Sequence, residues 1–508
     1  MSRISGLKCL FASRLTPRRN FATARLAFAE QSPFTAGQPL HETRPHTISP
    51  GELTPGISAL EYFQRRICVS SSMTTGSVAI IPGEQIKYAS GSVFFPFQQD
   101  NDFYYLTGWN EPNSVAIIEK PTANPDDVVF HLVVPPKDPA AEQWEGHRTG
   151  PDGAVEIFNA DVSESSKVLD KHIQKVLQKY RTVYYDFQDH KSSSLSSVVN
   201  SFFKKQVQTE NSRTIESLLK QGNKSVRSLR SIVSNLRAVK SEAELSIMRL
   251  AGKISGRAYN AAYARRFKTE KALCAFLEYR FISGGCDKSA YVPVVAGGAN
   301  SLCIHYTRND DLLRDGELVL VDAGGSLGGY AADISRTWPV SGKFTDPQKD
   351  LYEAVLSVNK HCIKLCTESA GVSIQDLHYE SVRVLTRELR NCGFAQIQDW
   401  ETSRLYPHYI GHNLGLDVHD VPSYPRSGKF KSGQVVTVEP GVYVPDNSKW
   451  PKHFRNIGIR IEDDVAVGKN TYTVLTSEAA KEVVDIEAIA QNGVTTPLEE
   501  EVVDIWSL

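Results

Sequence analysis

Two aspartates stand on either side of a glycine-rich turn in the stretch Glu317–Trp338, ELVLVDAGGSLGGYAADISRTW. The apolar run 318–321 ends in Asp322, a cluster of glycines allows a reversal, and the return run 330–337 carries Asp333. Antiparallel pairing would bring the two carboxylates side by side, and like charges on a buried face are unfavourable unless a cation lies between them. The pattern therefore predicts a metal-binding hairpin. The alternative, a surface hairpin with two solvated aspartates, fits less well because both aspartates interrupt apolar strands.

Further residues able to bind a metal lie before and after this hairpin. They are His305 in SLCIHYT; His408, His412 and His419 in YPHYIGHNLGLDVHDVP; Glu439 in VVTVEP; and Glu462 in IGIRIE. Both glutamates stand in runs of β-branched and apolar residues, which predicts that they lie on strands facing the same interior as the aspartates. Two aspartates, two glutamates and one histidine inside apolar strands are too many charges to bury unless they share a strong positive charge. Two divalent cations would provide it.

This ligand set indicates a particular chemistry. Oxygen-rich ligation with one imidazole suits Mn²⁺, Co²⁺ or Zn²⁺ better than a thiolate-selective metal, and bridging carboxylates fit two ions about 3–4 Å apart. Such a pair generates a hydroxide nucleophile near neutral pH. His305 and His419 are then available to bind the substrate carbonyl and stabilise the tetrahedral intermediate. Any one of these histidines alone is more often structural, so the hypothesis rests on the whole set.

Length and composition limit the class of protein. With 508 residues the chain is too long for one ordinary core, which predicts two domains with tails. Its 57 basic and 58 acidic residues give no charge bias towards nucleic acid or an anionic membrane, and no apolar run is long enough to span a membrane. Cys362 and Cys366 are the closest cysteine pair, but no second pair accompanies them, which favours buried thiols in a helix and a reducing compartment.

The amino-terminal stretch 1–29 is rich in Arg, Ser, Thr and Ala and contains no acidic residue. That composition is typical of a mitochondrial presequence, although a disordered basic tail remains the alternative. Within it, Arg19-Asn20-Phe21-Ala22-Thr23 gives an arginine, a spacer, a bulky aromatic residue and then small residues. We assign residues 1–21 to the presequence and residues 22–50, rich in Pro, Thr and His, to an extended arm.

A first domain, residues 51–239, has an α/β pattern without a phosphate loop or a GxGxxG motif. We expect helices near 57–68, 168–180 and 211–236, and strands at 77–81, 114–118 and 128–134. The aromatic run 94–112 is equally compatible with a pocket lining and with a buried core. Near Lys240 a capping box formed by Ser241 and Glu244 opens a helical pattern. A second domain is therefore assigned to residues 240–490, with a tail at 491–508, and the fold class is α/β (α+β).

The elements HYT, VDAGG, ADISRT, GHNLGLDVHD, VEPGVY and GIRIED, in this order and at these intervals, resemble the pita-bread metallopeptidases and, among them, the aminopeptidase P branch. The resemblance covers nearly all of residues 240–485. It implies that Asp322 holds one metal ion, that Asp333 and Glu462 bridge two ions, and that His412 and Glu439 hold the other. It also implies that His305, His408 and His419 are active-site histidines and that Arg460 supports the metal cluster. Manganese is the expected metal, with Zn²⁺ or Co²⁺ possible.

The segment NDFYYLTGWNEPNS resembles the amino-terminal creatinase/prolidase-like domain of aminopeptidase P members, which methionine aminopeptidases lack. Together with the presequence, it makes the chain similar to the mitochondrial aminopeptidase P group. This implies an aminopeptidase, expected to be a homodimer, that removes one large hydrophobic amino-terminal residue from imported proteins in the matrix or at the matrix-facing inner membrane. The alternatives are a general Xaa-Pro aminopeptidase, a prolidase, and a non-catalytic binding module; the complete ligand set disfavours the last.

Overall fold

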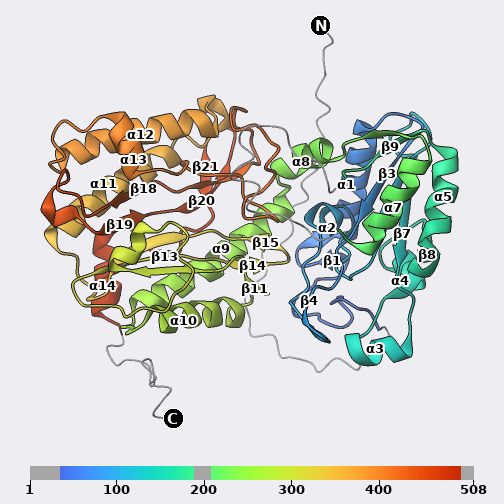
Figure 1. Ribbon diagram of the computed structural model, residues 1–508, viewed down its shortest axis with the longest axis horizontal. Helices are drawn as coiled ribbons and strands as arrows, with labels where there is room; N and C mark the ends of the chain where they lie inside the picture. The colour runs from blue at the N-terminus through green and yellow to red at the C-terminus, as the bar shows by residue number, and fades with distance from the viewer. Residues whose placement is uncertain (1–34, 188–207, 494–508) are drawn as a thin grey trace, which may run out of the picture. The chain divides into compact units, whose positions relative to one another are not determined.

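The computed structural model describes residues 35–187 and 208–493, and these residues divide into two compact units with the boundary between Leu236 and Arg237 (Figure 1). The predicted presequence 1–21, residues 22–34 of the predicted arm and residues 494–508 of the predicted tail lie outside the described residues. None of the described helices is long and apolar enough to cross a membrane.

The first unit is built on a six-stranded mixed sheet with the order β10-β9-β3-β6-β7-β8. Strand β3 pairs in parallel with β9 and antiparallel with β6, and β7 pairs in parallel with β8. The strands of this unit are β1 (Glu52–Thr54), β2 (Ile57–Ser58), β3 (Ser77–Pro82), β4 (Tyr88–Ser90), β5 (Val93–Phe94), β6 (Val115–Lys120), β7 (Val129–Val134), β8 (Val162–Ser165), β9 (Thr182–Tyr184) and β10 (Ser225–Arg227). The three predicted strands are thus present as β3, β6 and β7.

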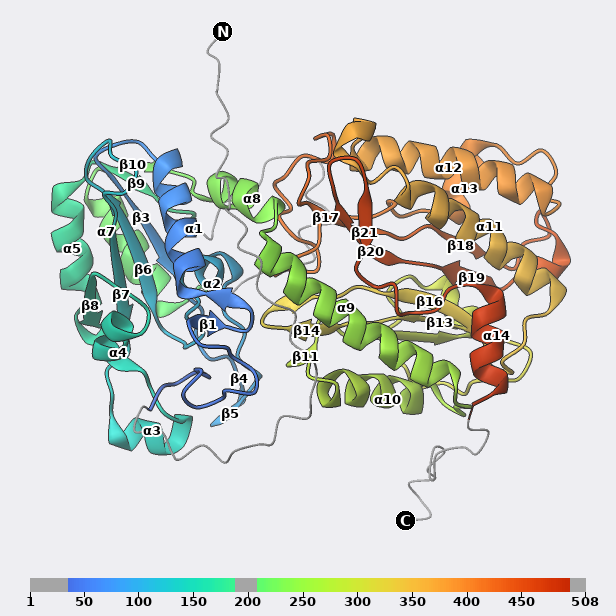
Figure 2. The same cartoon turned by 180° about the vertical axis from the view of Figure 1, so that it is seen from behind.

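Helices cover both faces of this sheet, with α1 on one face and α5 and α7 on the other (Figures 1 and 2). The helices are α1 (Ala59–Ser72), α2 (Asn101–Thr107), α3 (Pro139–Glu145), α4 (Gly150–Glu156), α5 (Leu169–Lys179), α7 (Glu210–Gln221) and α8 (Arg230–Ala238). Apolar side chains of α5 and α7, such as Ile173 and Ile215, pack with Ile80 and Ile117 of the sheet in one core. This apolar burial is the main force that holds the layers together.

Two details of this unit differ from the prediction. The helix expected over 211–236 is two helices separated by β10, because Asn223 adopts a positive φ of 43° directly after Gly222 and ends α7. The aromatic run 94–112 contains α2, whose Phe103 is fully buried, as is the following Trp109, whereas Phe94 and Phe95 are exposed. The carboxyl-terminal part of the run therefore belongs to the core.

The described residues of the second unit form four small sheets, with the orders β12-β13-β16, β11-β14-β15, β17-β20-β21 and β18-β19. The strands are β11 (Lys288–Ser289), β12 (Val294–Gly297), β13 (Leu318–Asp322), β14 (Gly325–Leu327), β15 (Tyr330–Ala331), β16 (Ser335–Pro339), β17 (Val435–Val438), β18 (Gly441–Val444), β19 (Ile457–Arg460), β20 (Asp463–Val467) and β21 (Tyr472–Val474).

Two groups of helices flank these strands, α9 with α10 on one side and α11 with α12 on the other (Figure 2). The helices are α9 (Glu242–Tyr263), α10 (Glu270–Ser283), α11 (Asp346–Ile363), α12 (Ile374–Asn391), α13 (Asp399–Leu405) and α14 (Val483–Gln491). The predicted capping box is present, since Ser241 caps α9 and Glu244 bonds back to the backbone of Ser241. Cys362 lies in α11 and Cys366 just beyond its end, and both are buried free thiols, as expected.

The predicted metal-binding hairpin is more elaborate than a single reversal. Strands β13 and β16 pair antiparallel, with Asp322 opposite Ser335, and β14 and β15 form a second, smaller hairpin inserted between them. Asp333 lies two residues before β16 rather than on a strand. At the base of the insertion Gly324 approaches the chain so closely that a Cβ atom would lie 1.9 Å from the carbonyl oxygen of Ala332. Only glycine permits this approach, which returns Asp333 to the side of Asp322.

Candidate metal centre

Asp322 and Asp333 meet at the hydroxyl group of Tyr291. The phenolic oxygen lies 2.6 Å from Oδ1 of Asp322 and 2.5 Å from Oδ1 of Asp333. A phenol carries a single proton and can donate to only one of these carboxylates at a time. The expected juxtaposition of the two aspartates is therefore present, and their charges are not balanced by Tyr291 alone.

Arg460 connects several members of the site from a fully buried position at the end of β19. Its Nη2 donates to Oδ2 of Asp322 at 2.6 Å, and its Nε donates to Oγ of Ser335 at 2.8 Å. The Ser335 hydroxyl in turn donates to Oε2 of Glu462 at 2.6 Å. One guanidinium group thus orients an aspartate directly and a glutamate through one hydroxyl group, as charge-assisted hydrogen bonds do.

His412 approaches the centre from a loop that runs along β17. Gly411 makes this possible, since a Cβ there would lie 2.0 Å from the carbonyl oxygen of Thr437. The Nε2 atom of His412 lies 3.5 Å from Oδ2 of Asp333 and 3.6 Å from Oε1 of Glu439. Its Nδ1 lies 3.0 Å from the carbonyl oxygen of Asn413. Because a carbonyl oxygen can only accept a hydrogen bond, Nδ1 carries the proton, and Nε2 points at the carboxylates.

The positions of these donor atoms are compatible with a bound cation. Ligand atoms of Asp333, His412 and Glu462 all lie within 4.8 Å of one another. Glu462 is 1 % exposed, and its Oε1 has no hydrogen-bond partner among the described residues. A buried carboxylate oxygen is rarely left unpaired in a native protein. Contacts of 3.5–3.6 Å are too long for strong hydrogen bonds, but they suit two ligands of one ion with bonds of about 2 Å.

The electrostatics of the site also favour a bound positive charge. Burial, together with the charges of Asp333, Glu439 and Asp322, raises the pKa of Glu462 well above its ordinary value. Burial also raises the pKa of Glu439 to about 7, although His412 and Arg460 oppose the rise. Burial would lower the pKa of His412, but Asp333 and Glu439 outweigh this and raise it to about 9. Without a cation, protons must therefore neutralise part of this cluster.

Of the remaining predicted histidines, His408 lies near Glu439 and His419 lies against His412, and both are neutral near pH 7. Arg460 donates to the hydroxyl of Tyr443, which lies 2.9 Å from Nε2 of His408. Burial and the Arg460 charge lower the pKa of His408 to about 3. The imidazole of His419 lies edge-on to that of His412, with 4.4 Å between ring centroids, and partial burial of the ring and the His412 charge lower the pKa of His419 to about 4. His305 is exposed.

The prediction that both glutamates lie on strands was wrong, and the sequence analysis missed several residues that contact the candidate ligands. Glu439 directly follows β17, and Glu462 lies between β19 and β20, so neither glutamate is on a strand. Sequence reasoning did not find Tyr291, a single tyrosine in a stretch without a recognisable spacing. Tyr443 and Ser335 stood inside the quoted motifs VEPGVY and ADISRT, where their position next to candidate ligands was the available signal.

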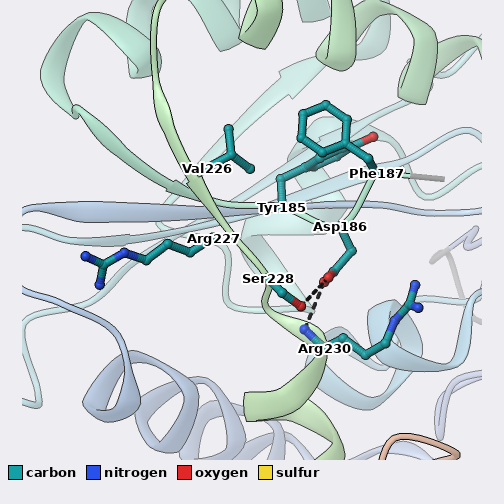
Figure 3. A pocket seen from close by; sticks show the side chains of 7 residues that line it. All are labelled: Tyr185, Asp186, Phe187, Val226, Arg227, Ser228 and Arg230. Atoms are coloured by element: carbon teal, nitrogen blue, oxygen red, sulfur yellow. Dashed lines mark hydrogen bonds between the residues drawn. The ribbon is translucent and has the colours of Figure 1, made fainter. Parts of the chain in front are cut away.

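A cavity of about 290 Å³ in the first unit does not offer comparable chemistry (Figure 3). Its described lining residues are Tyr185, Asp186, Phe187, Val226, Arg227, Ser228 and Arg230. The carboxylate of Asp186 accepts hydrogen bonds from the Ser228 hydroxyl and, at 2.8 Å, from the backbone N–H of Arg230. These bonds fix the start of α8, so Asp186 has a structural role there.

Comparison with known proteins identifies the family. Residues 246–469 match the model of metallopeptidase family M24, and residues 62–184 match the model described as aminopeptidase P, N-terminal domain. The chain is 52 % identical over 493 residues to intermediate cleaving peptidase 55 of Saccharomyces cerevisiae, covering 97 % of this chain and 96 % of that protein. The chain belongs to metallopeptidase family M24. It is a hydrolase and a metalloaminopeptidase of the aminopeptidase P type.

Two further similarities agree with this assignment. Intermediate cleaving peptidase 55, mitochondrial, of Arabidopsis thaliana is 35 % identical over 480 residues, covering 93 % of this chain and 91 % of that protein. A crystal structure of Icp55 from Saccharomyces cerevisiae matches with a TM-score of 0.80 and 52 % identity, covering 87 % of this chain and all of that chain. The predicted fold, a creatinase/prolidase-like α/β domain followed by a pita-bread catalytic domain, is confirmed.

Proposed function

We propose that this M24 enzyme removes a single amino-terminal residue, large and hydrophobic, from proteins imported into mitochondria, after a first protease has cut their presequence. The observation that carries the proposal is the convergence of Asp333, His412 and Glu462 within 4.8 Å, in a chain 52 % identical to a peptidase whose name describes the cleavage of intermediates. A mitochondrial location is supported by the basic, acid-free composition of residues 1–29 and by the name of the Arabidopsis relative.

We assign two divalent ions to the centre, most consistent with Mn²⁺ and with Zn²⁺ or Co²⁺ as alternatives, because the donors are mainly carboxylates with one imidazole. In this assignment Asp322 binds one ion, Asp333 and Glu462 bind both, and His412 and Glu439 bind the second. When bound, such ions polarise the substrate carbonyl and lower the pKa of water. Tyr291 and Arg460 hold Asp322 in place, and Ser335 holds Glu462.

Two of the three remaining histidines act on the substrate. We assign His419 and His305 to the scissile carbonyl, where an imidazole N–H can donate a hydrogen bond to the oxygen as it gains negative charge. His408 is held as an acceptor at Nε2, because Arg460 donates to the Tyr443 hydroxyl and leaves the proton of that hydroxyl directed at His408. Its Nδ1 then donates to the carbonyl oxygen of Tyr409 at 2.8 Å, which fixes the ring next to Glu439.

A general Xaa-Pro aminopeptidase is the second candidate, favoured by the match of residues 62–184 to the aminopeptidase P N-terminal domain. The two candidates differ in the residue that they require after the scissile bond. Peptides beginning Phe-Ala, Tyr-Ala and Leu-Ala should lose one residue at rates similar to those of their Phe-Pro, Tyr-Pro and Leu-Pro counterparts. Cleavage of only the proline set would contradict the proposal and support the second candidate. A restriction to dipeptides would indicate a prolidase.

Amino-terminal segments of peptides and imported proteins are therefore the proposed partners. The site is proposed to lie in the matrix or at the matrix-facing surface of the inner membrane. The expected homodimer stays a prediction, which light scattering of the purified chain would test.

A further inference from the structure

The amide of Asn359, a fully buried residue of α11, contacts the backbone directly before Glu439 and Glu462. Its Nδ2 donates to the carbonyl oxygen of Val438 at 3.0 Å and to that of Ile461 at 3.3 Å. Its Oδ1 accepts from Nζ of Lys481 at 2.9 Å. A single side chain thus contacts two distant segments of the chain and a lysine at the same time.

The surroundings determine the orientation of this amide. A lysine ammonium group can only donate, so it must face Oδ1, and backbone carbonyl groups can only accept, so they must face Nδ2. An aspartate would place an oxygen against both carbonyl groups, and a leucine would leave all three polar groups without this partner. Asparagine therefore fits the position because its amide offers a donor on one side and an acceptor on the other.

The two carbonyl groups belong to the residues that directly precede Glu439 and Glu462. At this point the antiparallel strands are interrupted: β17 pairs with β20 up to Val438 opposite Asp463, and pairing resumes with Gly441 opposite Arg460. The backbone N–H groups of the glutamates bond elsewhere, that of Glu439 to Ile410 and that of Glu462 to Ser335. The two glutamates therefore lie in the gap between the paired strands, so the strand pairing does not fix the distance between their carboxylates.

A charged network fixes Asn359 in turn. Lys481, which donates to Asn359, also donates to Oδ2 of Asp463 at 2.6 Å. Oδ1 of Asp463 accepts from Nη2 of Arg336 at 2.7 Å, and Arg336 donates further to the backbone carbonyl of Ser335 at 2.9 Å. Asp463 and Arg336 are both fully buried. The network thus connects Asn359 to the residues next to Glu462 and to the backbone of Ser335, whose hydroxyl bonds Glu462.

We propose that Asn359 is a positioning residue that sets the separation of Glu439 and Glu462 and so determines how tightly the centre binds its metal ions. The proposal rests on the proposed function, because it takes both glutamates as ligands. Residues that orient metal ligands typically change metal affinity or activity by about 10–100-fold when they are replaced. Loss of the Asn359 amide should therefore weaken metal binding and lower kcat, with KM little changed, since Asn359 does not contact the substrate.

The test compares Asn359→Leu with Val358→Ala, a change at the neighbouring, fully buried position of α11 that removes only apolar packing. Metal affinity is measured by titrating Mn²⁺ into the chelator-treated full-length protein, and kcat, KM and Tm are measured alongside. We expect Asn359→Leu to lose about 10-fold or more in Mn²⁺ affinity and in kcat. Val358→Ala should lower Tm but retain Mn²⁺ affinity within about 2-fold, the scatter expected of a change outside the ligand network.

Equal losses of affinity in the two variants, or wild-type affinity in Asn359→Leu, would overturn the proposal. Where Asn359→Leu does not fold, Asn359→Asp serves instead, since it keeps an oxygen for Lys481 and replaces the donor by an oxygen that repels both carbonyl groups. This variant should weaken Mn²⁺ binding, and wild-type binding would contradict the proposal. Glu462→Gln, measured in the same series, separates this inference from the proposed function. Wild-type Mn²⁺ binding by Glu462→Gln would show that the ligand assignment itself is wrong. Wild-type binding by Asn359→Leu, with weakened binding by Glu462→Gln, would show that only the positioning role is wrong.

Discussion

The hydroxyl oxygen of Tyr291 lies 2.5 Å from Oδ1 of Asp333, and the same oxygen lies 2.6 Å from Oδ1 of Asp322. Tyr291 precedes β12, while the two aspartates belong to a different hairpin, so the contact joins separate parts of the pita-bread domain. Because the hydroxyl has one proton, it orients the two carboxylates without neutralising both. This makes Tyr291 a direct probe of how the domain arranges its proposed metal ligands.

Tyr291→Phe should keep the ring packing and remove only this hydroxyl group. We expect about a 10–100-fold loss of metal affinity or of kcat, as for other residues that orient ligands. Tyr330→Phe is the matched control, since its hydroxyl donates to Glu244 at 2.8 Å from the inserted hairpin. The measurements are metal titration and steady-state kinetics. Equal metal affinity and equal kcat in the two variants would contradict a role of Tyr291 in the site.

Loss of a bridging carboxylate should have a larger effect. Asp333→Ala and Glu462→Ala should each abolish measurable turnover and lower the metal content, while circular dichroism shows a retained fold. The reason is that both carboxylates are assigned to both ions, whereas the fold depends mainly on the burial of apolar side chains. Glu478→Ala, which removes a half-buried ion pair with Arg249, is the control. Near-normal turnover with metal still bound would contradict the ligand assignment.

His419→Ala should separate catalysis from metal binding. Its imidazole is exposed and is assigned to the substrate carbonyl rather than to an ion, so the metal content measured by mass spectrometry should stay at the wild-type level. We expect kcat to fall by about 10²–10³-fold, the usual effect of removing one donor to a developing oxyanion. A variant that loses its metal would instead place His419 among the ligands.

The first unit should show acid sensitivity at Glu119, a buried residue of β6. Burial alone would raise its pKa, but hydrogen bonds from His131, Tyr180 and Lys179 outweigh it and lower the pKa from 4.5 to about 2. Because the folded pKa lies below the unfolded one, the carboxylate stabilises the unit above pH about 4.5, by about 3 kcal/mol, and this contribution is lost as the pH falls towards 2.

Hydrogen exchange of the β6 and β7 amides measures this contribution. Glu119→Gln should lower protection at pH 6, and its difference from wild type should shrink as the pH falls below about 4.5. Glu164→Gln, at an exposed position on β8, should show no such difference. A difference between Glu119→Gln and wild type that does not change with pH would show that Glu119 is not the titrating group.

Much of the candidate metal centre could be proposed from the sequence because its residues stand in short motifs with strong local signals. Asp322 ends an apolar run and Gly324 and Gly325 follow it, so the strand and the reversal were both predicted. The smaller hairpin β14–β15 was not, because its two strands have only three and two residues and lie inside what reads as one glycine-rich turn. The glutamates were assigned to strands because apolar runs do not reveal where a ladder is interrupted.

Long-range contacts account for what the sequence could not provide. Tyr291 reaches carboxylates 31 and 42 residues away, and Asn359 reaches carbonyl groups 79 and 102 residues away. No spacing rule for helices or strands extends over such intervals, so only the folded chain reveals these partners. In the first unit, Asn223 ended a helix that an apolar pattern alone predicted to continue.

The central claim, removal of one residue after a first cut, is tested most directly by mass spectrometry of mitochondrial protein amino termini, this chain's own included. Cells with the wild-type enzyme should be compared with cells carrying Asp333→Ala. We predict that a set of imported proteins is one large hydrophobic residue longer in the variant cells. We also predict that this chain begins at Ala22 when active and at Phe21 in the Asp333→Ala form, because the predicted first cut follows Asn20. Identical termini in both kinds of cell would contradict the account.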